Sequence, residues 1–171
     1  MSVRPTSDKV REAMFSILGT RLTGSRFLDL YAGTGAVGIE ALSRGADLVT
    51  FVESDPKTGQ LLRENLTVCS LLNRADLRIG TTQDFVLHPE RWRAPYDLLF
   101  ADPPYAAMEA TDLVLSCWNS TLLSPDALMI LEQDARTLLP DSTHGATLVR
   151  RYVYGDTALF VYRRIDQGSL A

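Results

Sequence analysis

The sequence predicts an α/β fold in which helices cover both faces of a mostly parallel β-sheet. Short apolar segments alternate with amphipathic segments along most of the 171 residues, a pattern typical of parallel strands joined by helices. A glycine-rich turn links the first apolar segment to the next amphipathic one. Near the C-terminus, two alternating segments are separated only by residues 153–157. This connection is too short for a helical crossover, so we expect an antiparallel hairpin there.

The N-terminal half predicts three strands and four helices. An amphipathic helix is expected at about residues 7–19, because Ser7 and Asp8 offer N-cap oxygens and Gly19 is a stop signal. The segments expected after it are a strand at 27–31, a helix at 37–44, a strand at 48–52 that ends at Glu53, a helix from Pro56 to about Leu72, a strand at 77–79 and a short helix at 82–87.

The C-terminal half is organised around one buried strand. The run from Leu98 to Ala101 is entirely apolar, as expected for a central strand covered on both faces. Pro103 and Pro104 have no N–H to continue a ladder, so the strand ends at Asp102. A helix at about 109–118, a strand at 128–131 and the hairpin segments 147–152 and 158–162 follow. We expect a single domain, 1–171, with a cofactor half at about 26–88 and a catalytic half at about 96–164.

Composition narrows the class of protein. With 46% hydrophobic and 22% charged residues the chain is expected to be globular, and its net charge of −4 disfavours wrapping of nucleic acid by bulk electrostatics. No apolar run approaches the ~20 residues of a membrane span, and the N-terminus lacks the apolar core of a signal peptide, so a cytoplasmic protein is expected. The two cysteines and two histidines are scattered, so no metal site is expected.

The glycine turn predicts a nucleotide site. Gly33, Gly35 and Gly38 follow a predicted strand and open a helix, and Glu53 ends the next strand. A carboxylate there can accept both ribose hydroxyls of an adenosine. A dinucleotide dehydrogenase shares these features but usually needs a separate substrate domain. The other candidate ligand is S-adenosylmethionine, whose amino-acid end Asp29 can help to hold. Asp84 could reach the adenine amino group, although a helix-capping role for it is equally consistent with the sequence.

The segment from Asp102 to Tyr105 is the candidate catalytic motif. Ligands of open α/β sheets bind beyond the carboxyl ends of the strands, where this segment is expected. The motif alone also fits a rigid surface turn. The chemistry favours catalysis, because an exocyclic amine or an amide nitrogen is a poor nucleophile. Asp102 and the Pro103 carbonyl could accept its two N–H bonds while Pro104 stiffens the turn and Tyr105 stacks on the planar group.

Taken together, these motifs resemble a known family. Segments 4–13, 27–46, 102–105 and 153–157 are similar to the RsmD-type methyltransferases, which modify the N2 of a guanine in small-subunit (16S) ribosomal RNA. The resemblance implies a Rossmann-like class I methyltransferase fold with seven strands, S-adenosylmethionine as cofactor and catalysis by residues 102–105. It implies cofactor contacts at Asp29, Tyr31, Ala32, Gly33, Thr34, Gly35, Gly38, Glu53, Ser54 and Asp84.

The resemblance also implies the partner. Small-subunit ribosomal RNA, free or in an assembling particle, is expected to meet Arg4, Lys9 and Arg11, and the protein is expected to be a monomer. Family members usually carry an Arg- and Gly-rich segment ahead of the Arg4-Pro-Thr motif, so weak RNA binding is expected of this chain alone. Two other classes remain open. One is methylation of another planar amine, a DNA adenine N6 or a protein glutamine N5, and the other is a non-catalytic module that binds cofactor and RNA.

Overall fold

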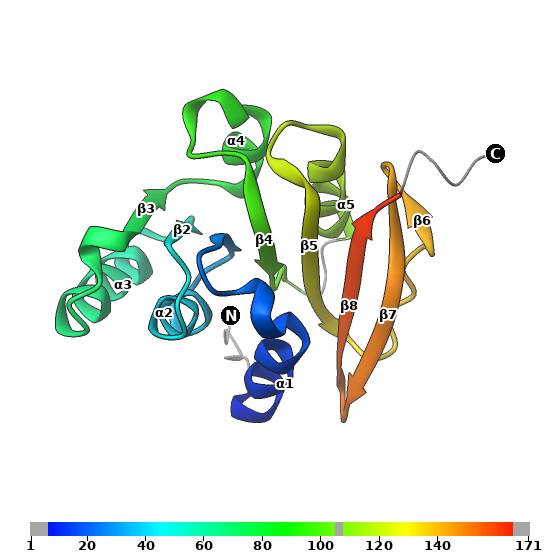
Figure 1. The fold of residues 1–171 in the computed structure, drawn as a ribbon, viewed down its shortest axis with the longest axis horizontal. Coiled ribbons are helices and arrows are strands. Elements are labelled where there is room, and N and C mark those ends of the chain that lie inside the picture. The colour runs from blue at the N-terminus through cyan, green and yellow to red at the C-terminus, as the bar shows by residue number, and fades with distance from the viewer. Residues whose placement is uncertain (1–6, 105–107, 166–171) are drawn as a thin grey trace.

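The computed structural model describes residues 7–104 and 108–165 and contains one eight-stranded sheet in the order β3-β2-β1-β4-β5-β8-β7-β6 (Figure 1). Strands β1 to β5 are parallel, whereas β8, β7 and β6 are each antiparallel to the preceding neighbour in the sheet. The expected parallel sheet with a C-terminal antiparallel hairpin is therefore confirmed. The strands are β1 (Arg26–Leu30), β2 (Leu48–Glu53), β3 (Ala75–Ile79), β4 (Tyr96–Ala101), β5 (Leu123–Asp134), β6 (Ser142–Thr143), β7 (Ala146–Tyr154) and β8 (Thr157–Arg164).

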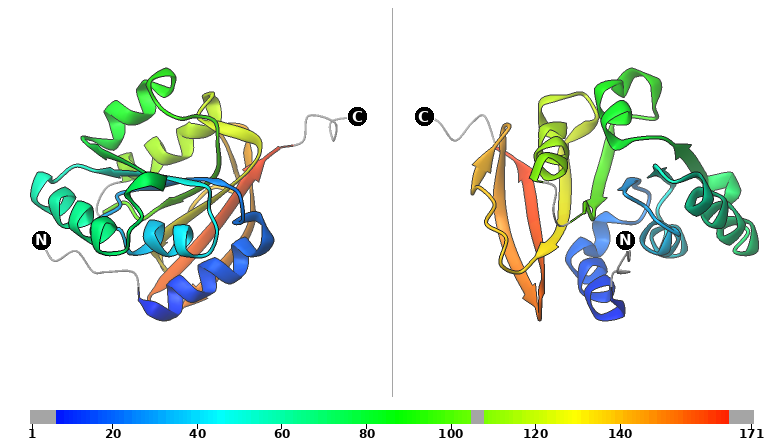
Figure 2. Two further views of the ribbon diagram at one scale, coloured as in Figure 1. Left: turned by 60° about the vertical axis from the view of Figure 1, so that its left-hand side comes forward. Right: turned by 180° about the vertical axis from the view of Figure 1, so that it is seen from behind.

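Five α-helices in the described ranges cover the two faces of this sheet. Helices α1, α2 and α3 lie on one side and α4 and α5 on the other, as the left view of Figure 2 shows. The helices are α1 (Asp8–Leu18), α2 (Ala36–Ser43), α3 (Pro56–Val68), α4 (Thr82–Leu87) and α5 (Met108–Ser116). None of them has the length and hydropathy that a bilayer span requires.

Local sequence explains where three of these helices begin. The Ser7 hydroxyl accepts a hydrogen bond from the Val10 N–H at 3.3 Å at the start of α1. The Asp55 carboxylate caps α3 through the Thr58 N–H at 2.8 Å, with Pro56 in the first turn. Thr81 caps α4 in the same manner. Each cap satisfies a backbone donor that the first helical turn leaves without a partner.

Strand β4 contributes to both hydrophobic cores, one on each face of the sheet. Leu98 and Phe100 belong to the core under α1 and α2, and Leu99 and Ala101 to the core under α4 and α5. All four side chains are at most 3% exposed. Successive strand residues point to opposite faces, so a strand covered on both sides must be apolar at every position. The continuous apolar run in the sequence has this cause.

The structure corrects several boundaries. The sheet has eight strands rather than seven, because the two-residue β6 adds an edge to the hairpin. Helix α3 ends at Val68 rather than near Leu72, since Ser70 takes a left-handed backbone with φ of 56° and cannot continue the helix. The hairpin strands are longer than expected, and only residues 155–156 separate them.

The topology brings two distant segments together. Strand β1 lies between β2 and β4, and Leu30 is in register with Ala101. The chain therefore leaves neighbouring strands in opposite directions, into α2 after β1 and past Asp102 after β4. Such a switch point opens a crevice at the carboxyl edge of a parallel sheet, which is the usual place for a ligand.

Candidate active site

The turn between β1 and α2 is shaped by close packing. Gly35 has φ of 89°, and a Cβ added to it would lie 2.1 Å from the Leu62 side chain. At Gly38 an added Cβ would lie 2.2 Å from the Phe51 ring. Any side chain at either position would force its neighbours apart, so both glycines let α2 begin directly against β2 and α3. By contrast, a Cβ on Gly33 would meet no atom within 4 Å, which leaves the turn open toward the sheet edge.

Two carboxylates hold this turn. Glu53, at the end of β2, accepts hydrogen bonds from the Gly33 N–H at 2.8 Å and from the Asp55 N–H at 3.0 Å. Asp29, on β1, is 1% exposed and accepts from the Gly38 N–H at 3.1 Å. Burial raises the pKa of Asp29 to about 7, with a smaller contribution from the negative charge of Glu53, while the Gly38 hydrogen bond opposes the shift.

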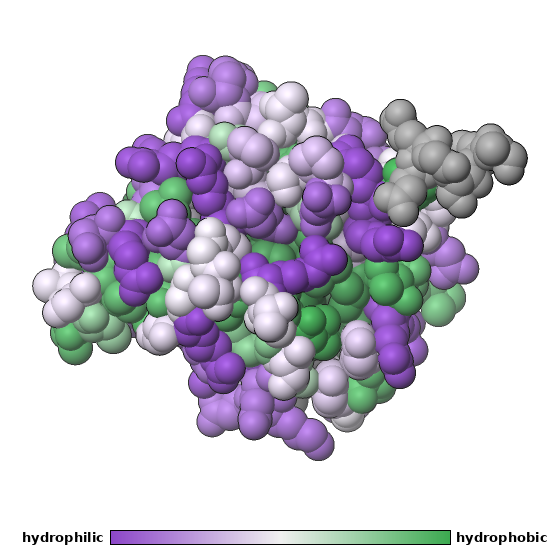
Figure 3. Space-filling model, viewed as in Figure 1, coloured by the Kyte–Doolittle hydropathy of each residue, from purple (hydrophilic) through white to green (hydrophobic). Residues whose placement is uncertain are grey.

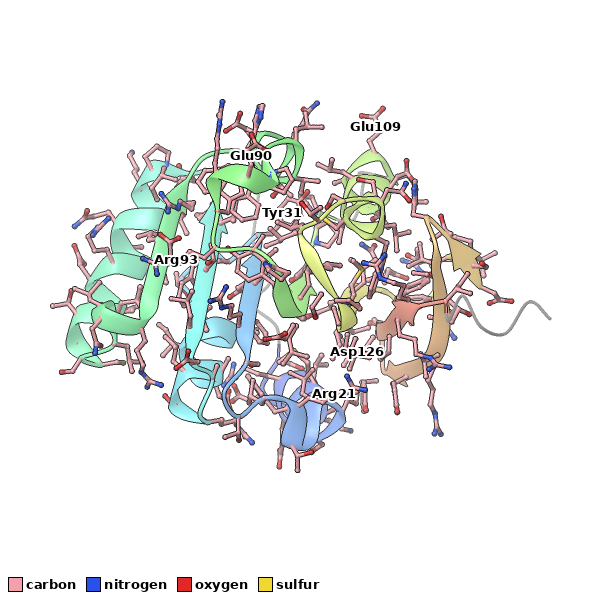
Figure 4. The ribbon with its side chains drawn as sticks, turned by 45° about the horizontal axis from the view of Figure 1, so that its top comes forward. Arg21, Tyr31, Glu90, Arg93, Glu109 and Asp126 are labelled. Carbon is pink, nitrogen blue, oxygen red and sulfur yellow. The ribbon has the colours of Figure 1, made fainter. Side chains whose placement is uncertain are left out.

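A cavity of about 590 Å³ opens beside Glu53, within the range of small-molecule sites. Tyr31 and Ser54 line it, together with residues of α4 and α5. Tyr31 has a left-handed backbone with φ of 58°. Burial raises the pKa of Tyr31, and a hydrogen bond with Thr82 on α4 opposes that rise. Figure 4 shows Tyr31 near the centre of the molecule, with Glu109 of α5 at its edge.

These residues fit S-adenosylmethionine. The Glu53 carboxylate beside the cavity can accept ribose hydroxyls, and the buried Asp29 carboxyl can hold the ammonium of the amino-acid end. A bound cation would also favour the ionised form of Asp29, which burial alone disfavours. The open space at Gly33 allows a ligand to approach the backbone of the turn.

Of the ten predicted cofactor residues, Tyr31, Glu53 and Ser54 line this cavity and the other seven do not. Asp84 borders an adjoining hollow of about 250 Å³, which shares Val52 and Thr81 with the larger one. The Ala32 N–H donates to the Val52 carbonyl at 3.0 Å. The Thr34 carbonyl accepts from the Asn65 side chain at 3.0 Å. Ala32 and Thr34 thus fix the shape of the turn through their backbones.

Asp102 follows β4 directly at the same sheet edge. The Pro103 side chain after it is buried and that of Pro104 is exposed, while Tyr105 lies outside the described residues. The pKa of Asp102 is raised to about 8, chiefly by burial and further by the negative charges of Glu132 and Asp29. Burial thus favours the protonated form of this carboxyl, and in either form a carboxyl oxygen remains a hydrogen-bond acceptor.

Glu132 is a residue that the sequence reasoning missed. It lies on β5 and is only 4% exposed. Ala101, at the end of β4, is in register with Leu131, and the negative charge of Glu132 acts on Asp102, so the two carboxyl groups lie near each other. The available signal was a glutamate directly after the apolar run 127–131, at the carboxyl end of a predicted strand. A buried carboxylate is costly and is common at functional sites.

The basic side chains expected to bind RNA differ in their exposure and in their partners. Lys9 is exposed on α1. The Arg11 guanidinium contacts Glu40 of α2 at 2.6 Å and Asp8 at 2.9 Å, so it joins the two helices. Arg4 lies outside the described residues.

Comparison with known proteins identifies the family. A family model described as "Conserved hypothetical protein 95" matches residues 1–163. The ribosomal RNA small subunit methyltransferase D of Escherichia coli K12 is 31% identical over 98% of this chain and 82% of its own length. The chain belongs to the RsmD family. The recognition made from residues 4–13, 27–46, 102–105 and 153–157 is thereby confirmed.

Solved structures support the RsmD assignment at the level of the fold. A putative methyltransferase, yhhF, from Escherichia coli superposes with a TM-score of 0.84 at 28% identity, covering 98% of this chain and 92% of that one. An RNA methyltransferase from Salinibacter ruber in complex with S-adenosyl-L-homocysteine gives a TM-score of 0.67 at 15% identity, with 96% and 95% covered. The class I methyltransferase fold expected for an RsmD-type chain is confirmed.

Proposed function

We propose that this protein transfers a methyl group from S-adenosylmethionine to the exocyclic N2 of a guanine in small-subunit ribosomal RNA. The proposal rests on one observation: the glycine turn and the segment that begins at Asp102 lie at the same edge of the sheet. The Glu53-pinned glycine turn follows β1, Asp102 follows β4, and these strands are hydrogen-bonded neighbours. The proposed cofactor turn and the proposed amine-binding group therefore lie at the same edge of the sheet, after neighbouring strands.

S-adenosylmethionine supplies an electrophilic methyl group. Glu53 and Ser54 border the cavity at the end of β2. Asp29 and Gly33, at the glycine turn, are the candidates to bind the amino-acid end of S-adenosylmethionine. The Salinibacter ruber protein of the same fold binds S-adenosyl-L-homocysteine, which supports this choice of cofactor.

Asp102 accounts for the activation of the amine. Its oxygen and the Pro103 carbonyl can accept the two N–H bonds of an exocyclic NH₂, which leaves the nitrogen lone pair free to attack. The negative charge of Glu132, which acts on Asp102, would also favour the nitrogen as it becomes positive. The choice of small-subunit RNA rests on the name of the Escherichia coli relative, and the choice of guanine N2 rests on the family motifs.

The direct experiment is transfer of labelled methyl groups. Small-subunit RNA, assembled small-subunit particles, DNA and a protein with an exposed glutamine are offered in parallel, and mass spectrometry of digested RNA locates the modified atom. We expect label in RNA or in particles, as N2-methylguanine. Label in DNA or protein, or at another atom of the RNA, would contradict the proposal.

Replacing Glu53 is expected to weaken cofactor binding roughly 10- to 100-fold, since each hydrogen bond to a charged group contributes about 1.5–3 kcal/mol. Saturating ligand raises the melting temperature through RT ln(1 + [L]/Kd). We expect a smaller ligand-induced shift for Glu53→Ala than for the wild type. Each shift is measured from the same variant without ligand, because the amides of Gly33 and Asp55 lose their partner as well.

Glu90 provides the matched control. Its side chain, labelled in Figure 4, is 67% exposed and is not among the residues that line the cavity. Glu90→Ala is expected to retain the full thermal shift. Equal shifts in Glu53→Ala and the wild type would remove Glu53 from the cofactor site.

A further inference from the structure

Three polar side chains on β7 face the side of the sheet that α1 covers. Arg150, Tyr152 and Tyr154 alternate along the strand and are in register with Val161, Leu159 and Thr157 of β8. Leu159 and Val161 belong to the core under α1, and both tyrosines pack partly against that core. Arg150 is exposed, and its guanidinium carbon lies 5.0 Å from the centre of the Tyr152 ring. We call these three residues the β7 aromatic surface.

This surface is aligned with Asp102. Glu132, the neighbour of Asp102, is in register with Leu159, which in turn is in register with Tyr152. Asp102 and Tyr152 thus lie at the two ends of one row across four strands. Three strand spacings of about 4.8 Å separate them by roughly 14 Å. A short stretch of single-stranded nucleic acid can bridge such a distance.

Charge favours a polyanionic partner here. The protein carries a net charge of −4, yet residues 146–164 contain four arginines against one aspartate. Arg151 and Arg164 also bind backbone carbonyls of the fold, whereas the exposed Arg150 stacks on Tyr152. Figure 3 shows hydrophobic and hydrophilic residues side by side over the β5–β8–β7 end of the sheet. Tyr152 and Tyr154 are half-buried, so each leaves part of its ring accessible. Accessible aromatic rings combined with arginine are a usual means of binding single-stranded RNA, because bases stack on the rings and phosphates pair with the guanidinium.

We propose that the β7 aromatic surface binds unpaired RNA nucleotides adjacent to the target guanine, with bases stacked on Tyr152 and Tyr154 and a phosphate paired with Arg150. The inference rests on the proposed function, because Asp102 marks the position of the target. It adds a substrate-positioning element remote from the reacting atoms. Register places this surface about three strand spacings from Asp102, and the row positions between them, Glu132 and Leu159, are buried.

The test measures the affinity of single-stranded RNA from the small subunit by fluorescence anisotropy, without methyl donor. Tyr152→Ala and Tyr154→Ala are each expected to weaken binding by roughly 5- to 100-fold. Tyr152→Phe and Tyr154→Phe are expected to stay close to wild type, since the ring carries the stacking. Arg150→Ala is expected to weaken binding and to reduce the salt slope, log Kd against log salt, by about 0.7. The tyrosine variants are expected to leave that slope unchanged.

Val153→Ala is the matched control. Val153 is 50% exposed on the same strand but alternates to the opposite side, in register with Ala158. Its replacement is expected to leave RNA affinity unchanged. Cofactor-induced thermal shifts, measured for every variant, report folding independently.

Three outcomes overturn the proposal. One is unchanged RNA affinity in all three alanine variants. Another is an equal loss in Val153→Ala. The third is a loss seen only with assembled particles, which would assign the surface to a ribosomal protein. If the variants lose RNA affinity as expected while the wild type transfers no methyl group to RNA, the surface stands and the proposed function fails.

Discussion

Replacing Asp102 by alanine is expected to lower the rate of methyl transfer to RNA by roughly 10²–10⁴-fold, the range in which positioned acid–base and acceptor groups act. The substitution removes the oxygen that we propose orients the amine. Cofactor affinity is expected to stay within a few-fold of wild type, because in the proposed function Glu53 and the glycine turn hold the cofactor. Single-turnover methyl transfer and the cofactor-induced thermal shift provide the two measurements.

Asp102→Asn separates geometry from charge. The amide retains a carbonyl acceptor but cannot take up a proton or carry charge, so we expect a smaller loss than for alanine. Asp134→Ala is a useful control on the next strand, because Asp134 pairs with Arg136 at the end of β5 instead of facing Asp102. A rate for Asp102→Ala close to that of Asp134→Ala would exclude Asp102 from the reaction.

Much of the fold could be predicted because its strongest signals are local. The run from Leu98 to Ala101 is apolar at every position because two cores cover β4. The caps at Ser7 and Asp55 are formed by the residues that begin the helices. Strand β6 could not be predicted, since two residues carry no periodicity and their pairing depends on the β7 strand beside them. The end of α3 depends on the backbone of Ser70, a residue with little preference for a left-handed conformation.

The site residues that local sequence specifies could be predicted, and those that depend on distant parts of the fold could not. Gly35, Gly38 and Glu53 belong to a motif with fixed spacing, and the structure brings them together around one turn. The prediction for Asp84 rests on an acidic side chain after a strand. In the structure Asp84 lies in the first turn of α4 and borders the smaller hollow, which shares Val52 and Thr81 with the larger one. Glu132 lies 30 residues beyond Asp102 in the sequence. Its role depends on strand register, which periodicity cannot supply.

The stability of the protein is expected to fall as the pH rises from about 4 to about 8, relative to an Asp102→Asn variant. The pKa of Asp102 is raised from 3.8 to about 8 in the folded protein, because burial and the charges of Glu132 and Asp29 disfavour ionisation. Below about pH 4 this carboxyl is protonated in both the folded and the unfolded state, so it does not lower the free energy of unfolding. Between these values the unfolded chain ionises while the folded protein keeps the proton, so unfolding becomes easier by at most about 1.4 kcal/mol per pH unit.

Asp102→Asn removes this titration while preserving the shape of the side chain. Urea unfolding of both proteins is measured between pH 4.5 and 8.5. Relative to the variant, the free energy of unfolding of the wild type is expected to fall across this range by a total on the order of a few kcal/mol, once local relaxation is allowed for. Other carboxyl groups within the described residues that act on Asp102 are Asp29 on β1 and Glu132 on β5, while Arg11 and Glu40 on the covering helices pair with each other. Glu132→Gln is therefore expected to reduce the pH dependence by lowering the pKa of Asp102. A constant difference in stability across the range would mean that Asp102 ionises normally, and that the charge acting on the amine is a fully ionised carboxylate at neutral pH.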